Sequence, residues 1–318
     1  MTQPAPTLGE MRASPAAQRS PARVRRRRRA AWRRRGRALL FVGPFLAVNL
    51  LVIAGPSVAT VFYSFTDWSG LGSPEWVGLD NYEQMVTSPD FWAAAAHNMI
   101  WTAIFVTVSI GLGLGGALLL AQITRGAIGL RLVYFVPYTV ASVVTASVWQ
   151  NIYDPTRGIG KLGDLGIPGL EDTAILGTAS TALPAVSVIN IWAFWGFVLV
   201  VCLAALQGVD RSLYEAARLE GASRWQQVRY VSIPGIRPVL VFIVVISVMF
   251  SVLVFDYVWI TTRGGPAGAT EVVGTLLYKE AFERFEAGYA AALGLSMTIV
   301  CGFVALFYLL LRRRGWEV

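Results

Sequence analysis

Few side chains in this 318-residue sequence have the types and spacing that enzyme or metal chemistry requires. Gly158-Ile-Gly-Lys161 comes nearest to a nucleotide-binding Walker A loop, but no Ser or Thr follows its lysine. The glycines of Gly111–Gly116 lie in an apolar stretch with no strand before them, so close helix packing explains them better than a dinucleotide site. His97 is the one histidine, and Cys202 and Cys301 have no partner ligands at metal spacing. We therefore expect no catalysis, no metal and no cofactor on this chain.

Polar groups inside apolar stretches are the next candidates, because they are costly in a membrane and mark solute pathways or helix joints. Asn98 and Asn190 suit either role. Asp256 fits a solute ligand or proton relay, although one continuous helix from residue 238 would place it about 27 Å along, at the outer interface. Tyr257 suits an interfacial aromatic belt or the wall of a solute pathway. The last candidates form a turn that either gates the pathway or simply ends a helix: Gly264, Gly265 and Pro266.

The stretch Ser212–Pro234 predicts two short helices joined by a glycine turn. Ser212 and Glu215 have the spacing of a capping box, as do Ser223 and Gln226. Gly221 suits the left-handed residue that ends the first helix, and Pro234 should stop the second. A hairpin of this kind, with small residues on one face, is suited to docking into a groove of another protein. The alternative is a surface loop that only packs on the chain's own helices.

Membrane helices must position these residues. Hydrophobic residues make up 55% of the chain and charged residues 14%, against about 25% charged in soluble domains, which excludes a soluble enzyme. A bilayer core needs about 20 apolar helical residues. Six runs without charged residues supply them, if the fifth extends to about Ile260 and the fourth spans 184–207 after an interfacial lead-in at Thr178–Leu183. The runs are 38–66, 91–124, 132–153, 173–209, 238–255 and 287–311. We predict an all-α, polytopic membrane protein with six transmembrane helices.

Charge asymmetry between the connections predicts the orientation. The segments 1–37, 125–131, 210–237 and 312–318 together carry 22 basic and five acidic residues, whereas the alternate connections carry five basic and 14 acidic residues. Positive loops stay inside, so both termini should be cytoplasmic. Residues 1–37, with 12 arginines and several prolines, predict a disordered arm that meets anionic lipid rather than nucleic acid, and residues 38–318 form the membrane domain.

Three motifs resemble a known family. Glu215-Ala216-Ala217, Gly221 four residues later and Val231-Ser-Ile233-Pro234 resemble the EAA motif of permease subunits of binding-protein-dependent ABC importers. The usual motif has Asp before the glycine and ends Ile-x-Leu-Pro, where this chain has Glu220 and Val-Ser-Ile-Pro. The segments Val77–Tyr82 with Phe91-Trp92, and Thr262–Phe282, are similar to loops of the carbohydrate-importer class. The resemblance covers about residues 38–314.

The resemblance implies an ABC-importer permease fold in a bacterial cytoplasmic membrane, forming half of a translocation pathway for a sugar or related polar solute by alternating access. It implies as partners a second homologous permease, two cytoplasmic ATPase subunits that bind ATP and Mg²⁺, and an extracytoplasmic solute-binding protein. The loop 210–237 would dock on an ATPase, and the docking residues are Glu215, Ala216, Ala217, Glu220, Gly221, Ala222, Ile233 and Pro234. A self-sufficient secondary transporter or channel is the alternative, but it would carry charged groups at mid-membrane and often internal repeats, and neither is evident.

Overall fold

The computed structural model describes residues 41–123, 126–158 and 174–313, so the predicted arm 1–37 lies outside the described residues. The chain divides into two compact units, Met1–Ala59 and Thr60–Val318. The helix Phe41–Tyr63 contains a π-helical stretch, η1 (Leu50–Ala54), and ends as α2 (Gly55–Tyr63). Its apolar window has a mean hydropathy of 2.0, and the helix is long and apolar enough to cross a membrane.

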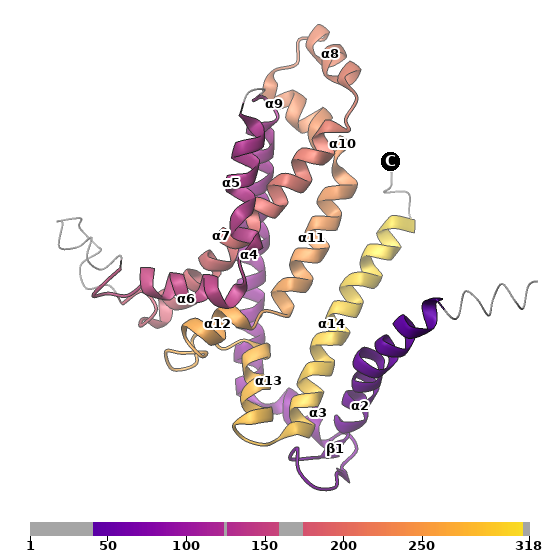
Figure 1. Cartoon of the computed structure of the whole chain (residues 1–318), viewed down its shortest axis with the longest axis vertical. Helices are drawn as coiled ribbons and strands as arrows, with labels where there is room; N and C mark the ends of the chain where they lie inside the picture. The colour runs from indigo at the N-terminus through magenta and orange to yellow at the C-terminus, as the bar shows by residue number, and fades with distance from the viewer. Residues whose placement is uncertain (1–40, 124–125, 159–173, 314–318) are drawn as a thin grey trace, which may run out of the picture. The chain divides into compact units, whose positions relative to one another are not determined.

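Three long helices of the second unit are apolar enough to cross a membrane: α4 (Pro89–Leu120), α7 (Ala179–Gln207) and α14 (Ala287–Arg313) (Figure 1). With Phe41–Tyr63 they match four of the six predicted spans. Helix α7 begins at Ala179, so most of the lead-in predicted at Thr178–Leu183 is helical; Ala182 and Leu183 are buried, whereas residues 178–181 are exposed.

The third predicted span is bent. It consists of α5 (Ala127–Thr139) and α6 (Ser142–Ile152), whose axes differ by 96°. Pro137 lies in the last turn of α5, and Val140 and Ala141 are extended with ψ near +135°. Proline and β-branched residues both disfavour continuation of a helix, which explains a break that apolar run length does not reveal.

The fifth predicted span is also broken, so its extension to about Ile260 is wrong. Helix α11 (Arg237–Val252) has 16 residues, about 24 Å of helix, and the chain leaves helical geometry before α12 (Asp256–Thr261). The short helices before α11, which run over Arg224–Gly235, meet it at 72°. The estimate that placed Asp256 about 27 Å along a continuous helix therefore does not hold.

Helix α7 forms the centre of the core. It packs against α4 and α5 through buried residues that include Ile189, Val198 and Leu199. Glycines allow close approach: a Cβ on Gly113 would meet Val198 side-chain carbons at 2.5 Å, and a Cβ on Gly196 would clash with the Tyr134 carbonyl oxygen. The prediction that small residues serve helix packing is thus confirmed at Gly113.

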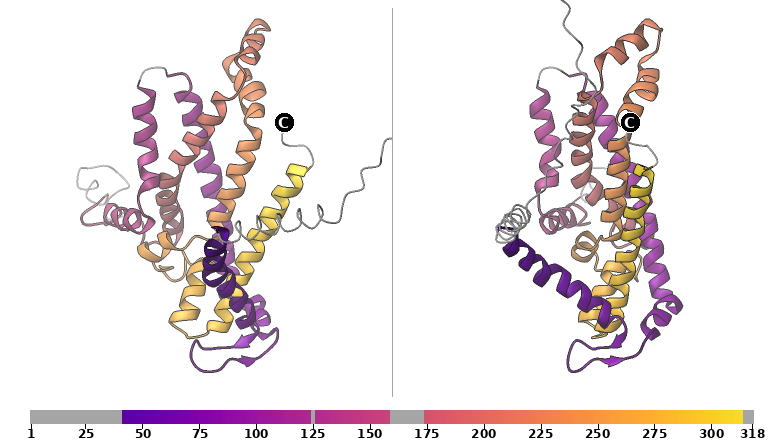
Figure 2. Two further views of the ribbon diagram at one scale, coloured as in Figure 1. Left: turned by 45° about the vertical axis from the view of Figure 1, so that its right-hand side comes forward. Right: turned by 90° about the vertical axis from the view of Figure 1, so that its right-hand side faces the viewer.

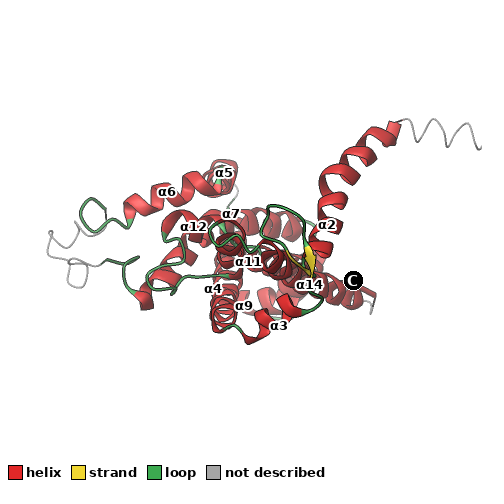
Figure 3. Ribbon diagram, turned by 90° about the horizontal axis from the view of Figure 1, so that it is seen from below, coloured by secondary structure: helices red, strands yellow, loops and turns green. Residues whose placement is uncertain are grey.

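The two ends of the second unit differ in structure (Figures 1 and 2). One end carries α3 (Asp80–Thr87), α13 (Val273–Phe282) and an antiparallel pair, β1 (Thr66–Asp67) with β2 (Glu75–Trp76). That pair is a small departure from the all-α prediction, and it stands out among the helices in Figure 3. The opposite end carries α8 (Arg211–Leu219), α9 (Arg224–Gln227), η3 (Val228–Ser232) and α10 (Ile233–Gly235).

Candidate functional site

The predicted docking stretch folds as a helical hairpin, and its first helix is capped by aspartate. Asp210 adopts an extended conformation, and its carboxylate accepts a hydrogen bond from the Ser212 backbone N–H at 2.9 Å. This bond holds the pKa of the Asp210 carboxyl below its ordinary value. The capping box predicted at Ser212 and Glu215 is therefore wrong, because α8 begins one residue before Ser212. The Glu215 side chain does not cap the helix and is exposed on its surface.

The turn of the hairpin follows the prediction. Gly221 has φ +76°, in the left-handed region. The Ala222 N–H donates to the Ala217 carbonyl at 2.9 Å, as in a Schellman motif that ends a helix. Ser223 then starts α9 with the predicted capping box: its hydroxyl accepts from the Gln226 N–H, and the Gln226 side chain accepts from the Ser223 N–H at 2.7 Å. The turn conformation is fixed by its own hydrogen bonds.

The second arm of the hairpin does not stop at Pro234. Helical geometry of mixed type continues through Gly235, and the sharp bend comes at Ile236, because proline is tolerated in the first turn of α10. The Tyr214 hydroxyl hydrogen-bonds the Ser232 hydroxyl at 3.0 Å, which joins the two arms. A hydrogen bond between side chains therefore connects the two arms of the hairpin.

The predicted docking residues lie mostly on the surface of this hairpin. Five are exposed and three are half-buried. The exposed ones are Glu215, Ala216, Glu220, Gly221 and Pro234, and the half-buried ones are Ala217, Ala222 and Ile233. Large apolar side chains are exposed beside them: Leu219 is 91% exposed, Trp225 71% and Tyr230 73%. Large apolar side chains exposed on a hairpin rich in charged residues suit a contact with another protein.

A cavity of about 480 Å³ opens inside the second unit, where the two broken spans meet. Asn190 from α7 lines it together with Asp256 and Tyr257 from the start of α12. The Asp256 carboxylate accepts a hydrogen bond from the hydroxyl of Ser142, at the start of α6. Non-helical backbone is tolerated at membrane depth where it is buried in protein or lines a cavity, so both helix breaks have a common physical reason.

Aromatic rings form much of the remaining wall of this cavity. They are Phe105, Tyr138, Phe194, Phe250 and Phe255. The rings of Tyr138 and Phe194 have centroids 6.1 Å apart, and those of Phe194 and Phe250 are 5.9 Å apart, both edge to face. A few convergent polar groups among aromatic rings are typical of a site for a small polar ligand.

The Asn98 side chain connects three helices, α4, α11 and α13, by hydrogen bonds. Its amide nitrogen donates to the Ser251 carbonyl at 3.1 Å, and its amide oxygen accepts from the Val273 N–H at 2.8 Å. These partners lie at the end of α11 and the start of α13, where helix termini leave backbone groups unpaired. The side chain is 8% exposed and does not line the cavity.

The turn at Gly264, Gly265 and Pro266 also lies away from this cavity. Gly264 has φ +86°, and a Cβ there would meet the Glu271 carboxylate, which pairs with Lys279. The Thr270 hydroxyl donates to the Gly265 carbonyl at 2.7 Å. The turn is thus part of a hydrogen-bonded loop between α12 and α13. Of the candidate pathway residues, the structure brings together Asn190, Asp256 and Tyr257 only.

Comparison with known proteins decides the family. Residues 109–316 match the model of the binding-protein-dependent transport system inner membrane component. A probable ABC transporter permease protein of Pyrococcus horikoshii is 33% identical over 282 residues, covering 88% of this chain and 96% of that protein. The chain belongs to this family of transport-system inner membrane components. The permease is also 32% identical, over 91% of its length and 86% of the relative, to the diacetylchitobiose uptake system permease protein NgcF of Streptomyces coelicolor.

The permease has the fold of solved ABC importers. It matches a chain of the bacterial alginate ABC transporter, crystallised in complex with an alginate pentasaccharide-bound periplasmic protein, with a TM-score of 0.78 and 20% identity over 90% of this chain and 97% of that one. Family membership makes the permease a non-catalytic, multi-pass component of a membrane complex that works with a binding protein, and ATP is hydrolysed on a partner ATPase. The predicted fold class and transport function are confirmed, and the alternative of a self-sufficient transporter or channel is wrong.

Sequence reasoning missed several residues of the permease. Ser142 gave no signal, because it faces Asp256 only once α5 and α6 bend apart. Tyr214 and Ser232 are 18 residues apart, and their bond depends on the hairpin closing. Asp210 could have been found, since aspartate is as good a helix cap as serine and lies two residues before Ser212.

Proposed function

We propose that the permease imports a sugar or a related polar solute, and that the cavity at the two helix breaks is part of its path. The observation that carries this proposal is the set of Asn190, Asp256 and Tyr257 among aromatic rings in a space of about 480 Å³. Sugars present apolar ring faces and many hydroxyl groups, which suit aromatic rings and convergent hydrogen-bonding groups respectively. The names of NgcF and of the alginate transporter, both of which concern saccharides, support the solute class.

The hairpin docks on a cytoplasmic ATPase subunit in this proposal. Its docking residues are the eight named above, and its exposed apolar side chains support a protein contact. A second homologous permease completes the pathway, two ATPases bind ATP and Mg²⁺, and an extracytoplasmic binding protein delivers the solute. Closure of the ATPases moves the hairpins together, and the pathway alternates between its two openings.

The proposed orientation places both ends of the chain in the cytoplasm of a bacterial cell, with residues 1–37 as an arm and 38–318 as the permease domain. It is supported by the positive charge of the connections at the hairpin end. Single cysteines at Gly72 and Ser223, in a background without Cys202 and Cys301, test it. A reagent outside intact cells should label the first and not the second. Outside labelling at Ser223 would overturn the orientation.

Reconstitution with the partner subunits tests the pathway. Sugars that bind the partner binding protein are first identified by thermal shift, and uptake of one of them is then measured in proteoliposomes. Asn190→Ala should reduce uptake at least fivefold while ATP hydrolysis still responds to loaded binding protein. Asn151→Ala removes an exposed amide of α6 outside the cavity and is the matched control. Equal uptake by wild type and the Asn190 variant would refute the pathway.

A further inference from the structure

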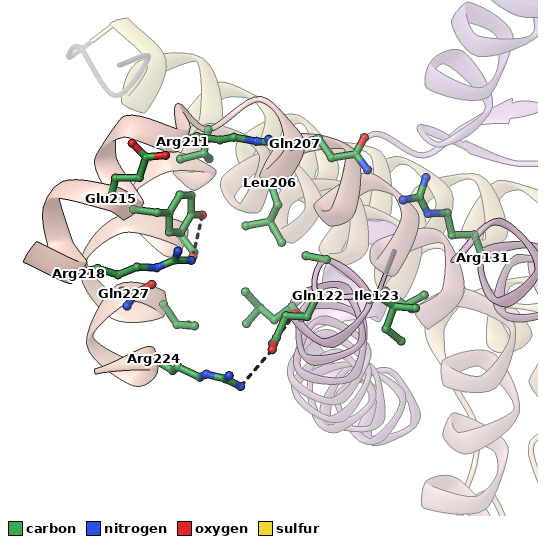
Figure 4. A pocket seen from close by; sticks show the side chains of 17 residues that line it. Gln122, Ile123, Arg131, Leu206, Gln207, Arg211, Glu215, Arg218, Arg224 and Gln227 are labelled. Carbon is green, nitrogen blue, oxygen red and sulfur yellow. Dashed lines mark hydrogen bonds between the residues drawn. The ribbon is translucent and has the colours of Figure 1, made fainter. Parts of the chain in front are cut away.

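A second cavity, of about 800 Å³, lies between the hairpin and the adjoining ends of α4, α5 and α7. Figure 4 shows Arg211, Arg218 and Arg224 reaching into this space from the hairpin, with Arg131 of α5 on the opposite side. We call it the arginine cavity. It is distinct from the cavity at the helix breaks, because the two share no lining residue.

The charges of the arginine cavity are not balanced. Glu215 is the one carboxylate among its lining residues, against four guanidinium groups. In the part of the chain that the structure describes, none of the four lies within ion-pairing distance of a carboxylate. The lining therefore carries an excess of three positive charges, and like charges repel one another.

One hydrogen bond holds an arginine of the hairpin against the membrane helices. Arg224 donates a hydrogen bond to the Gln122 side-chain oxygen at 3.4 Å, which bridges the hairpin to the chain just after α4. The Nε of Arg131 is buried and has no hydrogen-bond partner among the described residues. Gln207 and Gln227 add neutral amide groups to the wall.

Phosphate oxygens match this arrangement. Guanidinium groups bind phosphate with paired, charge-assisted hydrogen bonds, and several arginines around one space can each contribute such a pair. Basic pockets between the cytoplasmic ends of membrane helices also hold the headgroups of anionic lipids. In both cases the ligand is a phosphate group that arginine side chains bind.

We propose that the arginine cavity binds a phosphate group, carried by the headgroup of an anionic phospholipid or by a soluble phosphate compound. The bound phosphate joins α8 and α9 to α5, because the four arginines come from these three helices. It therefore sets the position of the hairpin relative to the membrane helices. The site does not depend on the proposed solute, but it shares Glu215 with the proposed ATPase-docking residues.

The experiment uses the full-length permease in nanodiscs. Thermal unfolding and native mass spectrometry are compared in phosphatidylcholine alone, in phosphatidylcholine with phosphatidylglycerol, and in phosphatidylcholine with inorganic phosphate added. Relative to phosphatidylcholine alone, phosphatidylglycerol or inorganic phosphate should raise the unfolding temperature of the wild type. The same phosphatidylglycerol or phosphate should stay bound in native mass spectrometry. Arg131→Gln and Arg218→Gln should each weaken this binding about fivefold, and the double variant about 25-fold, since each arginine near an anionic surface contributes comparably.

Arg229→Gln is the matched control, because it removes the same charge from an exposed position on η3 that does not line the cavity. Stabilisation by phosphatidylglycerol alone assigns the phosphate to lipid, and stabilisation by inorganic phosphate assigns it to a soluble compound. Arg218 is exposed, so its variant keeps the test open if Arg131→Gln fails to fold. No stabilisation in either arm, or equal loss in the Arg229 and Arg218 variants, overturns the proposal.

Discussion

Replacing Gly221 with aspartate tests whether the hairpin acts on a partner or only on its own chain. Gly221 has φ +76°, and a Cβ added there would meet no atom within 4 Å. The cost within the chain is thus backbone strain alone, about 1 kcal/mol, and aspartate tolerates the left-handed region better than most residues. Folded proteins are stable by about 5–15 kcal/mol, so the variant should still fold and reach the membrane.

The cost at a docked interface is larger. A carboxylate at the tip of the turn would enter a partly desolvated contact without a partner, at about 3 kcal/mol. That loss weakens association about 150-fold. We therefore expect near-normal abundance of the permease in membranes, together with loss of ATPase co-purification and of solute uptake.

Gly72→Asp is the matched control for strain. Gly72 has φ +77° with no atom within 4 Å of an added Cβ, and it lies in the loop between β1 and β2, at the other end of the unit. Both variants should have equal abundance, and only the Gly221 variant should lose the ATPase. If Gly221→Asp kept both co-purification and uptake, the hairpin would be an ordinary surface loop and the docking proposal would fail.

Three further changes follow from the structure. Glu215→Ala should weaken ATPase co-purification about fivefold without changing thermal stability, because the exposed carboxylate does not cap α8; an unchanged ATPase yield would contradict this. Asn98→Leu should lower the unfolding free energy by about 2–4 kcal/mol in detergent, since it leaves two buried backbone groups unpaired. Gly113→Ala should cost about 1–3 kcal/mol, because its Cβ would lie 2.5 Å from Val198 carbons, whereas Gly115→Ala, with open space, should be neutral; equal unfolding temperatures of the two variants would argue against the close contact.

The hairpin was largely predictable, because its structure depends on local residues. Gly221 and the Ser223 capping box are each fixed by contacts within five residues, which a sequence pattern can represent. The first cap was misplaced by two residues, since Asp210 and Ser212 are both good caps and their backbone conformation decides between them. The bend after Pro234 depends on packing, so the proline alone misplaced it.

The broken spans were not predictable from apolar run length, because length does not distinguish a straight helix from two short ones. The signals were present but weak: Pro137 near the end of α5, and a carboxylate, Asp256, inside an otherwise apolar run. Asp256 lies in the first turn of α12, where a negative charge is favoured by the helix dipole. The grouping of Asn190 with Asp256 depends on both breaks, so only the tertiary structure could reveal it.

Helix α7 offers a direct mechanical link between the two candidate sites. It carries Asn190 at the cavity and ends at Gln207, three residues before the Asp210 cap of the hairpin. Between these points its backbone lies so close to its neighbours that Gly196 leaves no room for a Cβ beside the Tyr134 carbonyl. Packed interiors transmit strain because they are close-packed and hardly compressible. A displacement of the hairpin should therefore move α7 and the cavity wall together with α4 and α5, rather than being absorbed by bending of α7 alone.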